Sequence, residues 1–187
     1  MIAVEGLDKG DGTICIFIRH GEKDTVQYGL TENGKREINA FSQKLLMLEQ
    51  GIQIYTSPEN RCMETASIIN SVVNEKETII RCSAFLGKPG IQVRDETAYA
   101  KLTDTMKCRN IFKEWKQGLH RDAMPSPETI RKEAMAFFTR TAIPNGITLY
   151  ISQSGTVACT GYALGLVDYK ADSEDWVDFL DGYVLRL

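Results

Sequence analysis

An uninterrupted apolar run, residues 14–18, stops abruptly at Arg19-His20-Gly21-Glu22. Such a run is typical of a buried parallel strand that delivers polar side chains to its carboxyl end, where open α/β sheets place their chemistry. Gly21 would let the backbone turn sharply or approach a ligand closely. A neutral imidazole beside a fixed cation suits attack on an anion, and a phosphoryl group matches the arginine fork. A strand that simply ends in a solvated Arg-His pair fits the tripeptide as well.

Strand patterns alternate with helix patterns along the rest of the chain. This alternation predicts an α/β fold, a three-layer α/β/α sandwich with a mostly parallel central sheet. Polar residues follow three of the strands, at His20, 57–61 and 152–154, and we expect them to converge in one crevice. Further strands are expected at 52–55, 77–82, 147–151 and, at the sheet edge, 183–185. Helices are expected after the N-caps Thr31 (ending at Gly51), Ser57 and Ser126, and at 101–117 and 156–164.

Length and charge narrow the class of protein. The 187 residues, 43% of them hydrophobic, have the size of a single domain, residues 1–187, with a sizeable core. A net charge of −3 does not favour nucleic acid or an acidic membrane as partner. No stretch approaches the roughly 20 apolar residues of a membrane span, and residues 1–12 do not resemble a secretory leader, so we expect a cytoplasmic protein. The five scattered cysteines show no metal or redox spacing, which predicts mostly buried, reduced thiols.

Three sequence blocks resemble those of a known family. IFIRHGE (16–22), LTENG (30–34) and TSPENRCMETA (56–66) are similar to the successive blocks of the histidine phosphatase superfamily, also called the phosphoglycerate-mutase-like fold. Residues 85–95 and 176–185 are similar to stretches of bacterial stand-alone members. The resemblance implies a phosphoglycerate-mutase-like fold, no cofactor or metal, and a small phosphorylated substrate or phosphate ion as partner.

The resemblance also implies roles for particular residues. His20 would be the nucleophile that forms a phosphohistidine, while Arg19 and Arg61 would bind the phosphate. A second phosphate-binding histidine normally follows the late strand, but this chain has Gln153 there. Where the family uses an S-H-D form, the aspartate can donate a proton, and that position is Ser154. Gln153 can still donate hydrogen bonds to phosphate, although it lacks the charge of an imidazolium.

The proton donor is open at this point. Other members of the family use a glutamate in an L-x-E pattern as the proton donor. At the corresponding positions this chain has Leu86-Gly87-Lys88, with a lysine in place of the glutamate. Replacement candidates are Asp95, Glu96 and Glu22, and Glu22 would also lie at the substrate, but for each of them the sequence favours a solvated loop carboxylate. The loops after Gly21, at 84–95 and at 118–127 would wall the crevice. His120 is expected at the surface, and Cys62 in helix packing rather than in catalysis.

These observations lead to a phosphatase, a phosphomonoester hydrolase acting through phospho-His20 on an unassigned substrate. Its activity would be reduced, because Gln153 and Ser154 replace groups that help phosphoryl transfer. The alternative is a catalytically impaired or inactive relative that binds a phosphorylated ligand or partner. Mutase activity would need a bisphosphate site that the sequence does not supply. The remaining hypothesis is that glutamine replaces histidine at position 153 in order to trap a complex.

Overall fold

A five-stranded sheet forms the centre of the molecule in the part of the chain that the computed structural model describes, residues 1, 2, 4, 7, 12–24, 29–48, 52–74, 79–171 and 176–187. The strand order is β3-β2-β4-β1-β5. Neighbours pair in parallel except β5, which runs antiparallel to β1. The place of β5 at the sheet edge is as predicted. The strands are β1 (Ile14–Arg19), β2 (Ile52–Thr56), β3 (Arg81–Cys82), β4 (Ile147–Ser152) and β5 (Gly182–Arg186).

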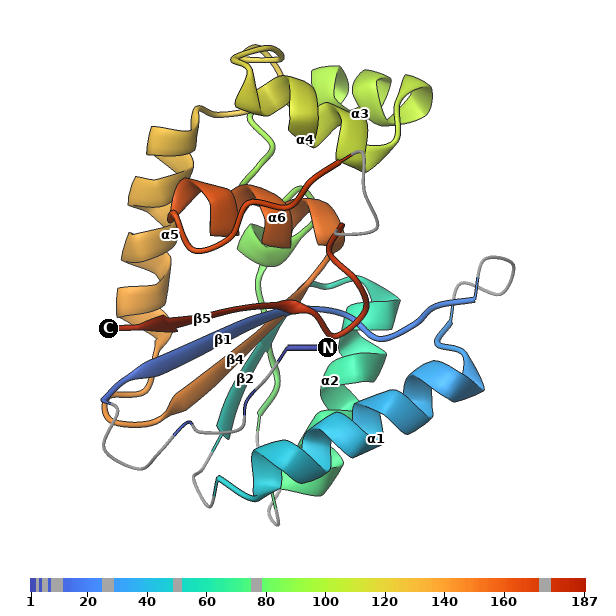
Figure 1. Cartoon of the computed structure of the whole chain (residues 1–187), viewed down its shortest axis with the longest axis vertical. Coiled ribbons are helices and arrows are strands. Elements are labelled where there is room, and N and C mark those ends of the chain that lie inside the picture. The colour runs from blue at the N-terminus through green and yellow to red at the C-terminus, as the bar shows by residue number, and fades with distance from the viewer. Residues whose placement is uncertain are drawn as a thin grey trace.

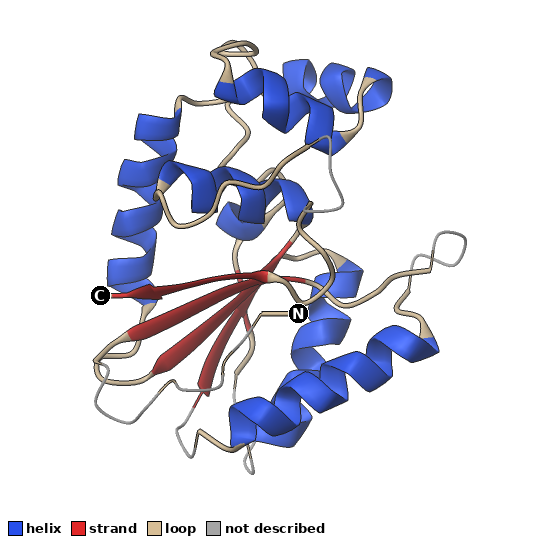
Figure 2. Cartoon of the chain, in the orientation of Figure 1, coloured by secondary structure: helices blue, strands red, loops and turns tan. Residues whose placement is uncertain are grey.

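Helices cover both faces of this sheet, so the predicted three-layer α/β/α architecture is confirmed (Figures 1 and 2). One pair of helices, α1 and α2, packs on one face, and α5 and α6 pack on the other. The pair α3 and α4 lies beyond α6, above the sheet in Figure 1. The helices are α1 (Glu32–Leu46), α2 (Asn60–Val73), α3 (Glu96–Thr105), α4 (Cys108–Lys116), α5 (Pro127–Thr141) and α6 (Ser154–Ala163), with a short 3-10 turn, η1, at Ala84–Leu86.

The apolar run that forms β1 is buried on both faces, because each face has its own hydrophobic core. Ile14, Ile16 and Ile18 belong to the core under α1 and α2. Cys15 and Phe17 belong to the core under α5 and α6. Since successive side chains of a strand point to opposite faces, a central strand between two helical layers needs no polar alternation. This explains why residues 14–18 form one continuous apolar stretch.

Two of the three predicted N-caps are confirmed. The Thr31 Oγ1 accepts from the Gly34 N–H at 2.9 Å, and the Ser126 Oγ accepts from the Thr129 N–H at 3.2 Å. Ser57 does not cap α2, which begins at Asn60 with Glu59 in the N-cap position. The Ser57 N–H still bonds the Ile151 carbonyl of β4, so the chain leaves the sheet only after this residue. Arg61 nevertheless lies in the first turn, as expected.

The single helix predicted at 101–117 is wrong, because two helices occupy this stretch. The α3 helix begins earlier, at Glu96, and the chain is extended at Met106 before α4 starts at Cys108. Ile111, Phe112 and Trp115 of α4 are buried in the core, whereas α3 buries no residue fully. The apolar positions that predicted one helix at 101–117 therefore belong to two helices, α3 and α4. Gly51 and residues 77 and 78 lie outside the described residues.

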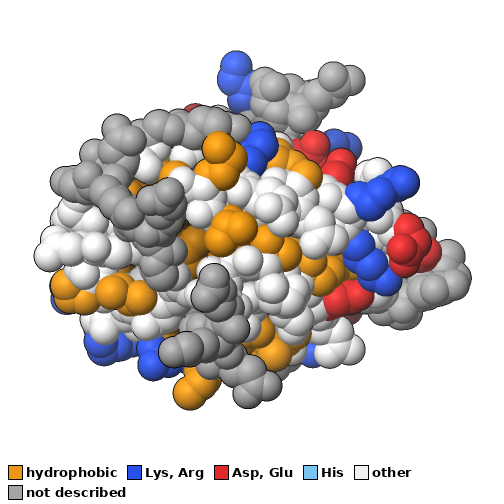
Figure 3. Space-filling view, turned by 90° about the horizontal axis from the view of Figure 1, so that it is seen from below, with side chains coloured by type: hydrophobic (Ala, Val, Ile, Leu, Met, Phe, Trp, Pro, Cys, Tyr) orange, Lys and Arg blue, Asp and Glu red, His pale blue; other side chains and the backbone are white. Residues whose placement is uncertain are grey.

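None of the described helices is long and apolar enough to cross a membrane. The face opposite the α3 and α4 pair shows hydrophobic side chains interspersed with polar and backbone atoms (Figure 3). All five cysteines are free thiols; Cys15, Cys62 and Cys159 are buried, as expected of most of them.

Candidate active site

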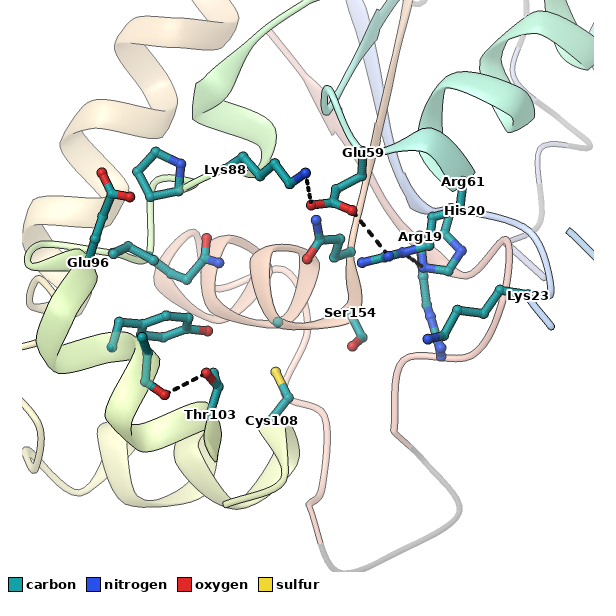
Figure 4. Close-up of a pocket in the computed structure, with 17 residues that line it drawn as sticks. Arg19, His20, Lys23, Glu59, Arg61, Lys88, Glu96, Thr103, Cys108 and Ser154 are labelled. Atoms are coloured by element: carbon teal, nitrogen blue, oxygen red, sulfur yellow. Dashed lines mark hydrogen bonds and ion pairs between the residues drawn. The ribbon is translucent and has the colours of Figure 1, made fainter. Parts of the chain in front are cut away.

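The carboxyl ends of β1 and β4 meet the first turns of α2 and α6 at one cleft of about 690 Å³. This is the crevice expected from the polar strand ends. Figure 4 shows the cleft, with side chains from the sheet, from both helices and from α3 pointing into it. The lining residues that carry polar side chains are Arg19, His20, Lys23, Glu59, Arg61, Lys88, Gln92, Glu96, Tyr99, Thr103, Cys108, Gln153 and Ser154.

His20 follows β1 directly, and only 3% of its surface is exposed. Its Nδ1 lies 2.7 Å from the Gly21 carbonyl oxygen, a contact in which Nδ1 must donate. Its Nε2 accepts a 3.0 Å hydrogen bond from the Nε–H of Arg61. The two contacts define one tautomer, with the proton on Nδ1 and the lone pair on Nε2. Nε2 is therefore the nitrogen that can attack an electrophile.

The surroundings keep the His20 imidazole neutral. Burial, together with the smaller effect of the charges on Arg19, Arg61 and Lys23, lowers the pKa of His20 from 6.5 to about 3, against the opposing effect of the hydrogen bond to Gly21. A protonated Nε2 would have no lone pair for attack. Burial and the same cations that suit an anionic ligand thus keep the His20 imidazole unprotonated.

Arg19, the last residue of β1, is held from the side by residues near the carboxyl terminus. Its Nη1 donates to the Val177 carbonyl at 2.7 Å, and its guanidinium lies 3.9 Å from the centre of the Phe179 ring. Burial lowers the pKa of Arg19, while nearby Asp178 opposes this shift. Its buried Nε has no hydrogen-bond partner among the described residues. An anion in the cleft would supply an acceptor for such a group.

Arg61 belongs to an ionic chain that the sequence analysis missed. Its Nη1 lies 3.2 Å from Oε2 of Glu59, and Oε1 of Glu59 lies 3.1 Å from Nζ of Lys88. Figure 4 shows both contacts, with Glu59 between the two cations. A carboxylate two residues before Arg61 was visible in the sequence, but nothing there placed it against Lys88, which comes from the loop after η1.

The amino end of α6 also faces the cleft. Gln153 occupies its N-cap position without a side-chain capping bond, and Ser154 is its first residue. Both residues line the cleft, and a hydrogen bond joins Ser154 to the Cys108 thiol. The first N–H groups of a helix and its dipole favour an anion at this end. The structure thus brings together His20, Arg19, Arg61, Gln153 and Ser154.

The three carboxylates considered as proton donors occupy different places. Glu96 lines the cleft. Asp95 instead caps α3, where its Oδ1 accepts from the Ala98 N–H at 2.8 Å. Glu22 lies outside the cleft lining, and its Oε2 accepts from Thr31 Oγ1 at 2.9 Å and Asn33 Nδ2 at 3.0 Å, which lowers the pKa of Glu22. Glu22 therefore joins the end of β1 to α1 rather than facing the crevice.

The segments that wall the cleft differ in part from the loops that the sequence predicted. Loop 84–95 and the segment after Gly21 contribute, through Lys88, Gln92 and Lys23 among others, but residues 118–127 do not line the cleft. The α3 and α4 helices take that place, because they lie over the amino end of α6. His120 lies outside the lining and contacts Glu114 at 2.7 Å.

Two further residues hold the site in place. Gly21 has no positive φ, but a Cβ here would lie 2.5 Å from the Ile38 side chain of α1. The glycine is thus needed for close packing against α1 rather than for a sharp turn. The Cys62 thiol is buried and contacts the Ser152 carbonyl at 3.6 Å, and burial raises the pKa of Cys62 to about 12. The expectation that Cys62 packs in the core beside α2 is confirmed.

Comparison with known proteins agrees with this geometry. Residues 15–86 match the sequence profile of the Histidine phosphatase superfamily (branch 1), which confirms the resemblance seen in the three blocks. No curated protein matches the chain.

Solved structures share the fold at low sequence identity. Mycobacterial glucosyl-3-phosphoglycerate phosphatase with VO3 superposes with a TM-score of 0.53 at 17% identity, covering 81% of each chain. An Entamoeba histolytica phosphoserine phosphatase mutant with phosphoserine gives 0.53 at 18%, covering 83% of this chain and 81% of that one. Phosphoglycerate mutase from Bacillus anthracis gives 0.53 at 14%, covering 82% and 80%. These similarities establish the phosphoglycerate-mutase-like fold.

Proposed function

We propose that this chain, which carries the histidine phosphatase sequence pattern over residues 15–86, is a phosphomonoesterase that works through a phosphohistidine on His20. The observation that carries the proposal is the state of His20: a buried, neutral imidazole whose Nε2 lone pair faces a cationic cleft. Arg19, Arg61 and the amino end of α6 line the same cleft and can donate hydrogen bonds to an anion there. Neutral nucleophile and cationic surroundings are what phosphoryl transfer requires.

In the first step, the Nε2 of His20 attacks phosphorus, the N–P bond forms and the P–O bond to the leaving alcohol breaks. Arg61 exchanges its bond to Nε2 for bonds to the phosphoryl oxygens, and Arg19 donates from the other side. The Gly21 carbonyl holds the Nδ1 proton and stabilises the cationic phosphoimidazole. In the second step, water attacks phosphorus and releases inorganic phosphate and neutral His20.

Gln153 weakens this arrangement without removing it. Its amide can donate to a phosphoryl oxygen, but it brings no charge. A hydrogen bond to a charged group is worth roughly 1.5 to 3 kcal/mol, so the loss of charge corresponds to about one to two orders of magnitude in rate. We therefore expect a slow phosphatase.

The substrate class is a small phosphorylated molecule. The solved relatives include phosphatases named for glucosyl-3-phosphoglycerate and for phosphoserine, and a cleft of about 690 Å³ admits molecules of this size. Location in the cytoplasm and organisation as one domain, residues 1–187, stay predictions from the sequence.

The test is hydrolysis of p-nitrophenyl phosphate between pH 4 and 8 by the wild type, His20→Ala, Gln153→His and, as matched control, His120→Ala. We expect His20→Ala to abolish turnover, His120→Ala to retain it and Gln153→His to raise it about 10-fold or more. Alkaline quench and mass spectrometry should find phosphate on His20, because the N–P bond survives base. Turnover that persists in His20→Ala would refute the covalent route.

A second candidate function follows from the contact between Arg61 and Nε2 of His20. A guanidinium that stays on the lone pair would leave a pocket that binds a phosphorylated ligand without cleaving it. In that case calorimetry would detect inorganic phosphate binding to the wild type and to His20→Ala, with no turnover and no phospho-His20 in any variant.

A further inference from the structure

Two carboxylates line the cleft in the described part of the chain, Glu59 and Glu96, and their contacts differ. Glu59 is 18% exposed and bridges two cations, Arg61 and Lys88. Glu96, in the first turn of α3, is exposed at the far wall in Figure 4. Of these two carboxylates, only Glu59 shares a hydrogen-bonding side chain with His20.

That shared side chain is Arg61. Its guanidinium donates to Nε2 of His20 at 3.0 Å and to Oε2 of Glu59 at 3.2 Å. A phosphoryl group attacked by Nε2 must take over the position that these donors now occupy. The carboxylate of Glu59, which accepts from the same guanidinium, then lies next to the phosphoryl group and to the oxygen that leaves it.

The charges around Glu59 change when a phosphoryl dianion enters. In the free cleft, Arg61 and Lys88 compensate the carboxylate. An incoming phosphoryl group competes for both cations and places further negative charge next to the carboxylate.

We propose that Glu59 is the general acid of the reaction, and this rests on the phosphatase function proposed above. As the P–O bond breaks, the Glu59 carboxyl proton passes to the leaving oxygen and an alcohol departs. In the second step, the Glu59 carboxylate removes a proton from the attacking water while the N–P bond to His20 breaks. Protons balance over the two steps, since Glu59 ends as it began.

Lys88 keeps the carboxylate aimed into the cleft. It lies in the left-handed region, with a φ of 63°, directly after Gly87, so the loop turns its ammonium back toward the first turn of α2. Without Lys88, the Glu59 side chain would have Arg61 as its remaining ionic partner in the described cleft. Lys88 is therefore a positioning residue for the acid.

The test compares Glu59→Gln with Glu128→Gln, the same loss of charge at an exposed residue of α5 outside the cleft lining, on phenyl phosphate and 2,4-dinitrophenyl phosphate. The two substrates differ mainly in how much their leaving groups need a proton. The value of kcat/KM is compared because it reports the steps through phosphorylation of His20. Loss of a general acid costs about 10² to 10⁴ where protonation is needed, so Glu59→Gln should lose at least about 100-fold on phenyl phosphate. Glu59→Gln should lose less than about 5-fold on the dinitrophenyl ester, and Glu128→Gln should lose little on either ester.

The pH profile of the wild type provides a second readout that needs no variant. Phenyl phosphate should show an alkaline fall in kcat/KM that the dinitrophenyl ester lacks, because only the former needs the protonated acid. Equal losses on both esters in Glu59→Gln, with identical alkaline limbs in the wild type, would overturn the role of Glu59. Phospho-His20 would still form in that case. Turnover that survives His20→Ala would instead refute the underlying phosphatase proposal.

Discussion

The Nε–H of Arg61 points at the lone pair of His20 Nε2 across 3.0 Å, so the group that should bind phosphate rests on the atom that should attack it. The first turn of α2 and the end of β1 are thereby coupled without a ligand. A phosphoryl group must compete with this hydrogen bond, and the neutral state of His20 is what makes the bond possible. The consequences can be measured in stability as well as in catalysis.

Stability should depend on pH through His20. The unfolded chain protonates this histidine near its ordinary pKa of 6.5, whereas burial and the neighbouring cations hold the pKa of folded His20 at about 3. Between these two values the unfolded state binds one proton more. The free energy of unfolding should therefore fall by about 1.4 kcal/mol per pH unit as pH drops from 6.5 toward 3, and the full contribution is present above 6.5.

Urea unfolding at pH 7, 6 and 5 measures this slope. His20→Gln should remove it, so the stability difference between the variant and the wild type should change by about 1.4 kcal/mol per unit below pH 6.5. His120→Gln, the matched change at the other histidine, should leave the slope in place. Parallel pH curves for the wild type and His20→Gln would show that folded His20 titrates normally.

Thr65 should hold the segment that follows β1, at Gly21, to α2. Its Oγ1 accepts from the Gly21 N–H at 3.1 Å and donates to the Arg61 carbonyl at 2.7 Å, and the residue is fully buried. Thr65→Val keeps the shape but leaves the Gly21 N–H without its acceptor. We expect a loss of about 1 to 3 kcal/mol in the free energy of unfolding, measured by urea titration.

Thr156→Val is the control for this substitution. Thr156 is equally buried, but its Oγ1 has no hydrogen-bond partner in the described structure. Removing that hydroxyl should be neutral or stabilising, because no partner is lost. If both valine variants lose the same stability, the hydroxyl contact to Gly21 contributes nothing.

Sequence reasoning located the parts of the site that depend on local pattern. The sequence indicates where Arg19 and His20 lie, because they end an apolar strand pattern. It also indicates where Arg61 lies, because this residue falls in the first turn of the helix that follows a strand. Both strand ends and helix starts are local features. The predicted start of a helix was wrong where tertiary contacts determine where the helix begins. Ser57 stays tied to Ile151 of the neighbouring strand, so α2 begins later than its Ser-Pro step suggested.

What the sequence could not show is which distant charges meet. Glu59 and Lys88 are 29 positions apart, and their pairing depends on how the loop after η1 folds over α2. Conversely, Asp95 and Glu22 had suitable chemistry, yet each is used locally, one to cap α3 and one to join β1 to α1. Side-chain type alone does not distinguish a carboxylate in a cleft from one that caps a helix.

Thiol reactivity should be confined to exposed positions despite the arginine beside Cys62. Burial raises the pKa of Cys62 to about 12, and the residue has no exposed surface. Cys82 is exposed on β3. Iodoacetamide at pH 8 should therefore alkylate Cys82 in the native protein and spare Cys62, because the thiolate is the reactive form and must be accessible. Peptide mass spectrometry would measure both, and rapid labelling of Cys62 would contradict its packing role.

Gly87 should be required for the geometry of the cleft. Its φ is 147°, and a Cβ at this position would lie 2.6 Å from Ser57 Oγ and 3.0 Å from Gln153 Nε2. Gly87→Ala must therefore push the loop away from Ser57, which follows β2, and from the Gln153 amide that is expected to bind phosphate. A backbone conformation of this kind costs on the order of 1 to 3 kcal/mol for other residues. We expect that loss in the free energy of unfolding and at least a 10-fold fall in kcat/KM for p-nitrophenyl phosphate.

Gly165→Ala separates the effect of close approach from the effect of backbone conformation. Gly165 also has a positive φ, 72°, but an added Cβ would meet no atom within 4 Å. This variant should lose about 1 kcal/mol of stability, the cost of the left-handed region alone, and should keep its activity. Because the two alanines differ in what surrounds them, a fall in kcat/KM confined to Gly87→Ala assigns that fall to displacement of Gln153 and Ser57. Equal activity in both variants would show that the loop can yield without disturbing the site.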